Sequence, residues 1–308
     1  MDVSIIIVNW NTRDILRDCL ESVYVCTKDI AFEVIVIDNA SSDGSADMAK
    51  REFPQVRLVE NSENKGFAAA NNQGMRLARG RYVLLLNSDT VVLDAAIQRA
   101  VGFADSHPEA GVVGCRVLNA DRSLQPTCFM FPSVLNILLW TTYVYKLFSR
   151  SRFWGRERMT WWNRDDVREV DVVTGCFMLV RREAIERVGP MDEQFFMYAE
   201  EADWCYRFSR AGYKRLFMPD AQIIHLGGAS SDQIKPRMIA QWRKSTLLYF
   251  RKHKGPLALG AAWALLSMFY LTRVPYWVAR AAVGRLRNRR QLRSARVLSE
   301  IHCDENGT

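Results

Sequence analysis

The first ninety residues alternate apolar runs with amphipathic stretches, and this alternation limits the possible folds more than any other feature of the chain. The run VSIIIVNW at 3–10 is continuous and rich in β-branched residues, which is typical of a strand buried on both faces. Further strands are predicted within 32–45 and at 56–60 and 81–90, with helices at 12–25, 47–53 and 67–78. Strand–helix alternation with short links predicts an α/β fold with parallel strands and right-handed crossovers.

Polar side chains end three of these predicted strands. They are Asn9 and Asn11 after the first strand, Asp38 and Asn39 after the second, and Asn87 and Asp89 after the fourth. In open α/β sheets the ligand lies beyond the carboxyl ends of the strands. Because parallel strands bring these ends to one edge, we predict a single binding site there.

Composition and cysteine usage exclude several classes. A chain of 308 residues with 49% hydrophobic and 25% charged residues suits one large globular domain, or a domain with an appendage. The seven cysteines are odd in number and form no CxxC pair, which argues against a zinc ribbon or a disulfide framework. The start, MDVSIIIVNWN, does not match a signal peptide. These features favour a reducing, cytoplasmic setting.

The net charge of +8 is concentrated late in the chain. Residues 273–296 contain eight arginines and no acid, and the preceding residues 256–272 are apolar and uncharged. This apolar stretch is slightly short for a membrane-spanning helix. We therefore interpret 229–308 as a helical, basic region that lies on the anionic inner face of the cytoplasmic membrane. The alternative is an ordinary C-terminal helix packed on the core.

The middle of the chain has a different character. Residues 123–145 carry no charge, and their prolines and polar residues argue against a spanning helix, so we expect a buried helix pair or an apolar flap near a lipid. Residues 150–164, RSRFWGRERMTWWNR, mix arginines with aromatics. Such a mixture can bind nucleic acid. The apolar flanks favour an interface instead, and no nucleic-acid partner is expected.

Several strand-end residues could bind a nucleotide diphosphate. Asp89, as the second acid of an acid–any–acid pattern, could hold Mg²⁺ or Mn²⁺, although Asn87 at the first position supplies no charge. Asp38 could accept hydrogen bonds from a ribose or a base. Lys65 and Gly66 precede a helix, whose N-terminus could steady phosphate. The plainer alternatives are an Asx turn at Asp89, a turn cap at Asp38 and a loop lysine.

A second set of candidates lies near the C-terminal end of the patterned region. Glu200, Glu201 and Asp203 fall within one helical turn, where mutual repulsion would raise the proton affinity of at least one of them. Such a carboxylate can act as a general base. A helix start with acids favoured by the dipole is the alternative. His225 follows an apolar strand and could reach the ion held by Asp89, although lone histidines there are usually structural.

Five motifs in order carry a family resemblance. They are DNASSDGS, NKGFAAANNQG, LLLNSDT, TGCFMLVRREAIERVG and FFMYAEEADWCYR. The sequence resembles the family 2 glycosyltransferases of the GT-A fold over residues 2–228, most of all the rhamnosyl- and galactofuranosyltransferase-like branch that builds bacterial polysaccharides. The resemblance implies a mostly parallel, Rossmann-like central sheet flanked by helices, with membrane-associating helices at the C-terminus. Within 1–228 it implies a nucleotide-binding half at 1–118, an insertion near the acceptor site at 123–165 and an acceptor half at 170–228.

The resemblance also implies a nucleotide-sugar donor, a divalent cation (Mg²⁺ or Mn²⁺) and inversion at the anomeric carbon. The implied donor site comprises Val8, Asn9, Asp38, Asn39, Lys65, Gly66, Asn87, Ser88 and Asp89. Asp89 is the implied metal ligand, with His225 completing the site as in some relatives. Glu201 stands where the family's base is usually Asp, so Glu200 or Asp203 could be the working group instead.

The substrates and the alternatives follow from the same resemblance. We expect dTDP-rhamnose or a UDP-sugar as donor, and a polyprenyl-diphosphate-linked sugar or a polysaccharide as acceptor. A sugar nucleotidyltransferase is one alternative, although NWNTRD is not the Gly- and Arg-rich loop of such enzymes. The other is a non-catalytic protein that binds nucleotide sugars or serves as a membrane scaffold.

Overall fold

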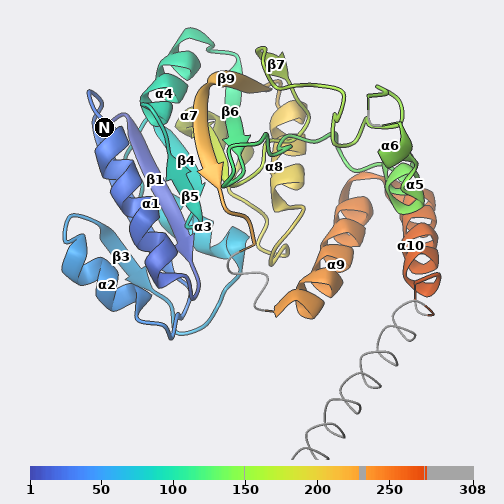
Figure 1. Cartoon of the computed structure of the whole chain (residues 1–308), viewed down its shortest axis with the longest axis horizontal. Helices are drawn as coiled ribbons and strands as arrows, with labels where there is room; N and C mark the ends of the chain where they lie inside the picture. Colours follow the sequence, from blue (N-terminus) through green and yellow to red (C-terminus); the bar gives the residue numbers. More distant parts are fainter. Residues whose placement is uncertain (149, 229–233, 274, 276–308) are drawn as a thin grey trace, which may run out of the picture. The chain divides into compact units, whose positions relative to one another are not determined.

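The computed structural model describes residues 1–148, 150–228, 234–273 and 275. The chain forms two compact units, residues 1–262 and residues 263–308. The first unit contains the whole sheet (Figure 1).

The N-terminal half of the sheet is parallel. Its strands are β1 (Val3–Asn9), β2 (Phe32–Asp38), β3 (Arg57–Glu60) and β4 (Tyr82–Asn87), in the order β3-β2-β1-β4. The helices between them are α1 (Arg13–Cys26), α2 (Ser45–Glu52) and α3 (Phe67–Leu77). The predicted α/β alternation is confirmed. The carboxyl ends of β1, β2 and β4 meet at one edge, since Asn9 lies opposite Asp38 and Val8 lies opposite Asn87.

The rest of the sheet is mixed. It contains β5 (Thr90–Val92), β6 (Ala110–Leu118), β7 (Arg168–Glu169), β8 (Phe177–Arg181) and β9 (Lys214–His225). The order continues from β4 through β8, β6 and β9 to β5, and β8 is antiparallel to both of its neighbours. The expectation of a mostly parallel sheet is confirmed, because β6 and β9 pair in parallel and run in the same direction as β1–β4, whereas β5, β7 and β8 run the opposite way. Because β8 is antiparallel to both β4 and β6, it begins at the carboxyl edge and runs back across the sheet.

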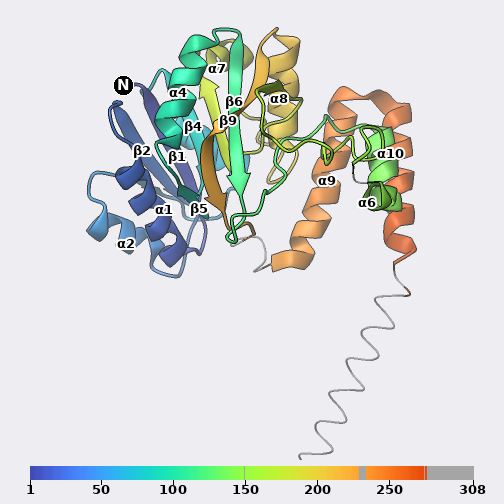
Figure 2. The same ribbon diagram turned by 45° about the horizontal axis from the view of Figure 1, so that its top comes forward.

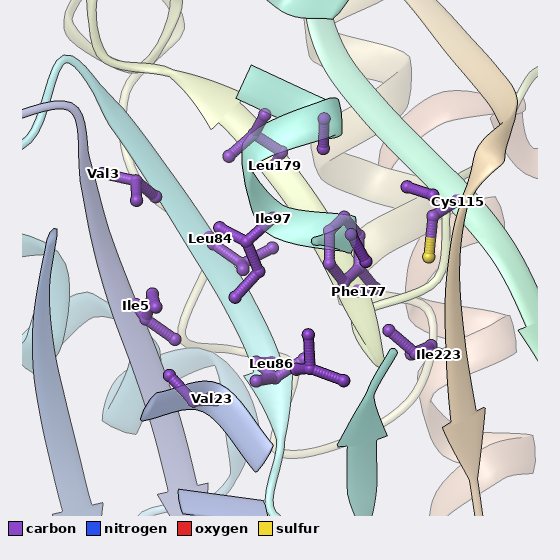
Figure 3. Packing of buried hydrophobic residues seen from close by; sticks show 14 of the residues in the cluster. Val3, Ile5, Val23, Leu84, Leu86, Ile97, Cys115, Phe177, Leu179 and Ile223 are labelled. Atoms are coloured by element: carbon purple, nitrogen blue, oxygen red, sulfur yellow. The ribbon is translucent and has the colours of Figure 1, made fainter. Parts of the chain in front are cut away.

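Both faces of the central strands are buried, which explains their unbroken apolar runs. On one face, alternate residues such as Ile5 and Leu84 pack against Val23 of α1 and Ile97 of α4 (Ala96–Ser106) (Figures 2 and 3). On the other face Ile6 packs against α3 at Gly74, where an added Cβ would lie 2.5 Å from the Ile6 side chain. Each buried aliphatic side chain contributes roughly 1.5–3 kcal/mol to folding.

The remaining helices either lie between later strands in the sequence or come after the last strand, β9. They are α5 (Val134–Thr142), α6 (Val144–Leu147), α7 (Arg182–Val188), α8 (Glu200–Arg210), α9 (Lys235–His253) and α10 (Gly255–Leu271). The uncharged segment 123–145 contains α5 and the first two residues of α6. This helix pair is only partly buried: Leu139 is buried whereas Leu147 is 80% exposed. Among the described residues, no helix is both long enough and apolar enough to cross a membrane. Within the predicted basic region 229–308, residues 229–233, 274 and 276–308 lie outside the described residues.

Candidate active site

A cavity of about 250 Å³ lies at the carboxyl edge of β1 and β4. The predicted site residues that line it are Val8, Asn39, Gly66, Asn87, Ser88, Asp89, Glu200, Glu201 and His225. They come from both halves of the sheet and from α8, so residues up to 217 positions apart in the sequence share one site.

Asp89 and His225 meet because their strands pair. Ser88 and Asp89 form the tight turn between β4 and β5, and β5 is antiparallel to β9, which places Thr90 opposite His225. His225 Nε2 lies 3.1 Å from Asp89 Oδ1 and 3.2 Å from Asn87 Nδ2. The turn and the binding site are therefore compatible interpretations of LLLNSDT, because the turn is what directs Asp89 into the cavity.

The chemistry of these side chains fits a divalent cation. A carboxylate oxygen and an imidazole nitrogen this close can share one Mg²⁺ or Mn²⁺ ion, and Asn87 can turn its amide oxygen toward the same point. The described part of the chain contains no cluster of three or more His, Cys, Asp or Glu residues suited to a metal.

The same cavity is also lined by a pair of carboxyl groups. α8 begins at Glu200, directly after Tyr198 and Ala199, whose φ values of 69° and 64° are left-handed. This backbone costs roughly 1–2 kcal/mol per residue. Because this turn precedes Glu200, the first residues of α8, Glu200 and Glu201, both line the cavity.

The two carboxyl groups differ in their surroundings. Burial, and then the charge of Glu201, raise the pKa of Glu200 well above its usual range, and Glu200 Oε2 has no hydrogen-bond partner among the described residues. Burial also raises the pKa of Glu201, but hydrogen bonds oppose the shift, including one from the Gly175 N–H to Oε1 at 3.1 Å. Glu200 therefore holds a proton more firmly, and Glu201 is the better candidate for a free carboxylate.

Gly66 forms a close contact that the site requires. Its φ is +80°, and a Cβ there would lie 2.3 Å from Phe196 O, the atom that accepts a hydrogen bond from the Phe67 N–H.

Gly66→Ala should lower the free energy of unfolding by about 2–4 kcal/mol because it adds backbone strain and a clash. Urea denaturation measures this. Gly102→Ala in α4 is the matched control: its Cβ meets nothing within 4 Å, so we expect a gain of about 0.5–1 kcal/mol. A Gly66→Ala variant as stable as the wild type would contradict the contact.

Three predicted donor-site residues do not line the cavity. Asp38 is buried, and its two oxygens accept hydrogen bonds from Asn9 Nδ2 at 3.0 Å and from the Ser41 N–H at 2.9 Å. This is the turn-capping geometry of the plainer alternative, and it fixes the loop that carries Asn39. Asn9 is buried beside Asp38, and Lys65 is exposed outside the cavity.

Asp203 also lies away from the cavity. It is fully buried, and it accepts hydrogen bonds or ion pairs from Arg207 at 2.9 Å, Lys252 at 2.6 Å and His253 at 2.7 Å. These partners fasten α8 to α9. The structure therefore keeps Asp203 out of the cavity that Glu200 and Glu201 line.

Sequence reasoning missed several residues of the site. Those that line the cavity are Trp10, Asn64, Phe67, Phe196, Met197, Tyr198, Gly228, Ile234 and Met238. Asn64 could have been found as the neighbour of Lys65. The aromatic residues and methionines carry no signal, because an apolar side chain in a sequence is more often core than cavity. Gly175 and Gln125, which contact Glu201 and His225, were missed as well.

This arrangement defines the class of protein. An α/β half whose strand ends deliver Asp89 to one cavity, opposite a pair of carboxyl groups on a helix, is the arrangement of a GT-A glycosyltransferase. Sequence comparison gives the family: residues 4–189 match the model of glycosyl transferase family 2, and the chain belongs to it. The family assignment favours a glycosyltransferase over a sugar nucleotidyltransferase.

Curated relatives agree with the predicted branch. The chain is 27% identical over 274 residues to N-acetylglucosaminyl-diphospho-decaprenol L-rhamnosyltransferase of Mycobacterium tuberculosis, covering 83% of this chain and 86% of that protein. It is 25% identical to the O-antigen biosynthesis protein RfbC of Myxococcus xanthus, over 74% of this chain and 17% of that one. The predicted similarity to a rhamnosyltransferase is confirmed.

Solved structures confirm the GT-A fold. The mannosyltransferase PcManGT from Pyrobaculum calidifontis, in complex with GDP-Man and Mn²⁺, superposes with a TM-score of 0.56 at 19% identity, over 92% of this chain and 79% of that one. GalNAc-T7 with UDP, GalNAc and Mn²⁺ has a TM-score of 0.54 at 17% identity, over 73% and 44% of the two chains.

Proposed function

We propose that this glycosyltransferase moves a sugar, with inversion, from a nucleotide sugar to a hydroxyl of a polyprenyl-diphosphate-linked sugar or a polysaccharide. The observation that carries the proposal is the single cavity in which Glu200 and Glu201 face Asn87, Asp89 and His225. The similarity to a rhamnosyltransferase whose name states a decaprenol-diphosphate acceptor supports this acceptor class and dTDP-rhamnose as the first donor to try. UDP-sugars are the second choice.

The donor would be held at the strand ends. Asp89 and His225 are the proposed ligands of Mg²⁺ or Mn²⁺, and a bound cation would neutralise charge on the diphosphate. Asn39 and Gly66 line the cavity where the nucleoside would lie. Asn39 Nδ2 links their two loops, because it donates to both Asn64 Oδ1 and Gly66 O at 3.3 Å.

The transfer step would use Glu201 as the general base. Glu201 takes the proton from the acceptor hydroxyl, whose oxygen bonds to the anomeric carbon as the bond from that carbon to the diphosphate oxygen breaks. The leaving group is the nucleoside diphosphate, and attack from the opposite face inverts the anomeric configuration. The Gly175 N–H keeps Glu201 Oε1 in place, and the proton on Glu200 avoids a second buried negative charge.

One experiment tests this reaction. The purified chain is incubated with dTDP-rhamnose or UDP-sugars, a polyprenyl-diphosphate-linked acceptor and Mn²⁺, and the product is analysed by NMR. We expect a new glycosidic bond whose anomeric configuration is opposite to that of the donor. A product with retained configuration would rule out the single displacement.

We also propose that the protein works in the cytoplasm, peripherally on the inner face of the cytoplasmic membrane. Residues 122–156 contain no acid, and their basic side chains lie among exposed apolar ones: Leu147 is 80%, Phe148 53% and Phe153 51% exposed. Apolar and aromatic side chains beside arginines suit an anionic lipid surface. Leu257, at the start of the uncharged α10, is 91% exposed.

Sedimentation with anionic vesicles tests the membrane proposal. A chain that ends after Gly255 should bind phosphatidylglycerol vesicles much more weakly than the full chain, because it lacks the apolar and basic C-terminal residues. A full-length chain with Leu147→Ser and Phe148→Ser should also bind more weakly, and Val25→Ser, which alters a 66% exposed residue on α1, is the matched control. If the truncated chain still sediments fully, the assignment of the C-terminal region to the membrane fails.

A further inference from the structure

A row of side-chain hydrogen bonds leads to His225 from the loop after β6. Gln125 Oε1 lies 2.7 Å from His225 Nδ1, and Gln125 Nε2 lies 2.9 Å from Asn119 Oδ1 and 3.0 Å from the backbone oxygen of His225. Asn119 Nδ2 lies 2.9 Å from Ser123 Oγ, which in turn lies 2.5 Å from Asp121 Oδ1. The Gln125 N–H donates to Val117 O at 2.9 Å, so the row is anchored to the end of β6.

Which atoms donate and which accept along this row can be deduced from its end at His225. A backbone carbonyl only accepts hydrogen bonds, so the amide nitrogen of Gln125 must face the His225 carbonyl. The amide oxygen of Gln125 then faces Nδ1 of His225. Because that oxygen has no proton to give, Nδ1 must carry the hydrogen.

The hydrogen bonds at the other end of the row, at Asp121, require the same order of donors and acceptors. Hydrogen bonds from Ser123 hold the pKa of Asp121 below its usual value, so this carboxylate remains an acceptor. The Ser123 hydroxyl donates to it and therefore accepts from the Asn119 amide nitrogen. Asn119 Oδ1 is left to accept from Gln125 Nε2, which again turns the oxygen of Gln125 toward His225.

We infer that Gln125 is a positioning residue, which holds His225 in the tautomer protonated on Nδ1 and so turns the lone pair of Nε2 toward Asp89. A neutral imidazole carries one ring proton, and only its unprotonated nitrogen can bind a cation. Nε2 is the nitrogen that lies 3.1 Å from Asp89 Oδ1. The role of His225 as a cation ligand rests on the proposed function, whereas its tautomer does not.

The inference predicts how substitutions of Gln125 change cation affinity. Gln125→Leu removes the acceptor at Nδ1, and we expect the affinity for Mn²⁺, measured by calorimetry, to fall by about 10–100-fold. Gln125→Glu keeps an oxygen at this position and should retain most of the affinity. Gln222→Leu is the matched control, because Gln222 is exposed on the same strand three residues before His225.

The direct test is ¹⁵N NMR of the imidazole rings in the metal-free full chain at about pH 8. Loss of signals in His225→Asn assigns the ring. We expect the proton on Nδ1 in the wild type and in Gln125→Glu. In Gln125→Leu it should move to Nε2, where Asp89 is the nearest acceptor.

Two outcomes would overturn the inference: a wild-type ring protonated on Nε2 alone, or an unchanged spectrum in Gln125→Leu. If Gln125→Leu does not fold, the wild-type and Gln125→Glu spectra still decide the tautomer. If the spectra agree with the inference but Mn²⁺ does not bind, the positioning role stands and the proposed cation site fails.

Discussion

Glu201→Gln should reduce sugar transfer by about 10²–10⁴-fold while nucleotide-sugar binding stays intact. The amide keeps the size of the side chain and can still accept the hydrogen bond from the Gly175 N–H, but it cannot take a proton from the acceptor. Steady-state kinetics should show the loss in kcat, and calorimetry should show an unchanged donor Kd. A fall in donor affinity of similar size would contradict the role of Glu201 as a base.

Glu200→Gln is the matched control. Glu200 is the carboxyl group of the pair that holds a proton, so an amide resembles it closely and transfer should remain within a few-fold of the wild type. Burial raises the pKa of Glu200 in the folded state, so its contribution to stability is present at low pH and is lost as the pH rises through that raised pKa. Glu200→Gln should therefore raise the Tm at pH 9 by several degrees. If Glu200→Gln lost transfer activity while Glu201→Gln kept it, Glu200 would be the general base and Glu201 the protonated neighbour.

The pH dependence of transfer follows from the same pair. A general base works only when it is deprotonated, so the rate should rise with pH through the pKa of Glu201. Burial raises that pKa, and the acidic limb of the profile should therefore lie above about 4.3, the value of an ordinary glutamate. A limb at or below that value would argue against Glu201.

Asp89→Asn should abolish the dependence of donor binding on Mn²⁺ and lower kcat by about 10²–10³-fold. The substitution removes the charge that lies 3.1 Å from His225 Nε2, and with it the charged ligand that would hold the cation against the diphosphate. Calorimetry of Mn²⁺ with UDP, dTDP and GDP measures the first effect, and donor turnover measures the second.

Asp94→Asn is the matched control for Asp89→Asn. Asp94 is exposed just after β5, and asparagine tolerates its φ of 34°, so binding and turnover should not change. Wild-type Mn²⁺ affinity in Asp89→Asn would mean that this residue only forms the turn between β4 and β5.

The strand ends were predictable from the sequence because their pattern is local. Continuous apolar runs gave β1, β2 and β4, and the polar residues after them pointed to one edge. The pairing of β5 with β9, which brings His225 to Asp89, joins segments 135 residues apart at Thr90 and His225. A pairing at this distance leaves no local pattern, so the sequence alone does not place His225 beside Asp89.

The spacing of the carboxyl residues in α8 did not predict which of them line the cavity. Glu200, Glu201 and Asp203 share one turn in the sequence, but their environments are decided by what packs against each side of α8. Lys252 and His253 of α9 bury and neutralise Asp203, whereas the cavity borders the other two. Nothing in the spacing of these acids reveals which side α9 will cover.

The antiparallel orientation of β8 was hidden for a related reason. The long segment between β6 and β8 contains only the short helices α5 and α6 and the two-residue strand β7. It has no strong period of its own, and its path depends on tertiary contacts such as those of buried Arg164, which donates to four backbone carbonyls.

The most direct test of the account is a thermal-shift panel of nucleotide sugars, with and without Mn²⁺ or Mg²⁺, on the wild type and Asp89→Asn. A ligand that binds only the folded state raises the Tm. We predict that one nucleotide class, dTDP-rhamnose first and UDP-sugars second, stabilises the wild type only when the cation is present, and that Asp89→Asn loses this shift. Saturating donors that stabilise both proteins equally without a cation would contradict the account.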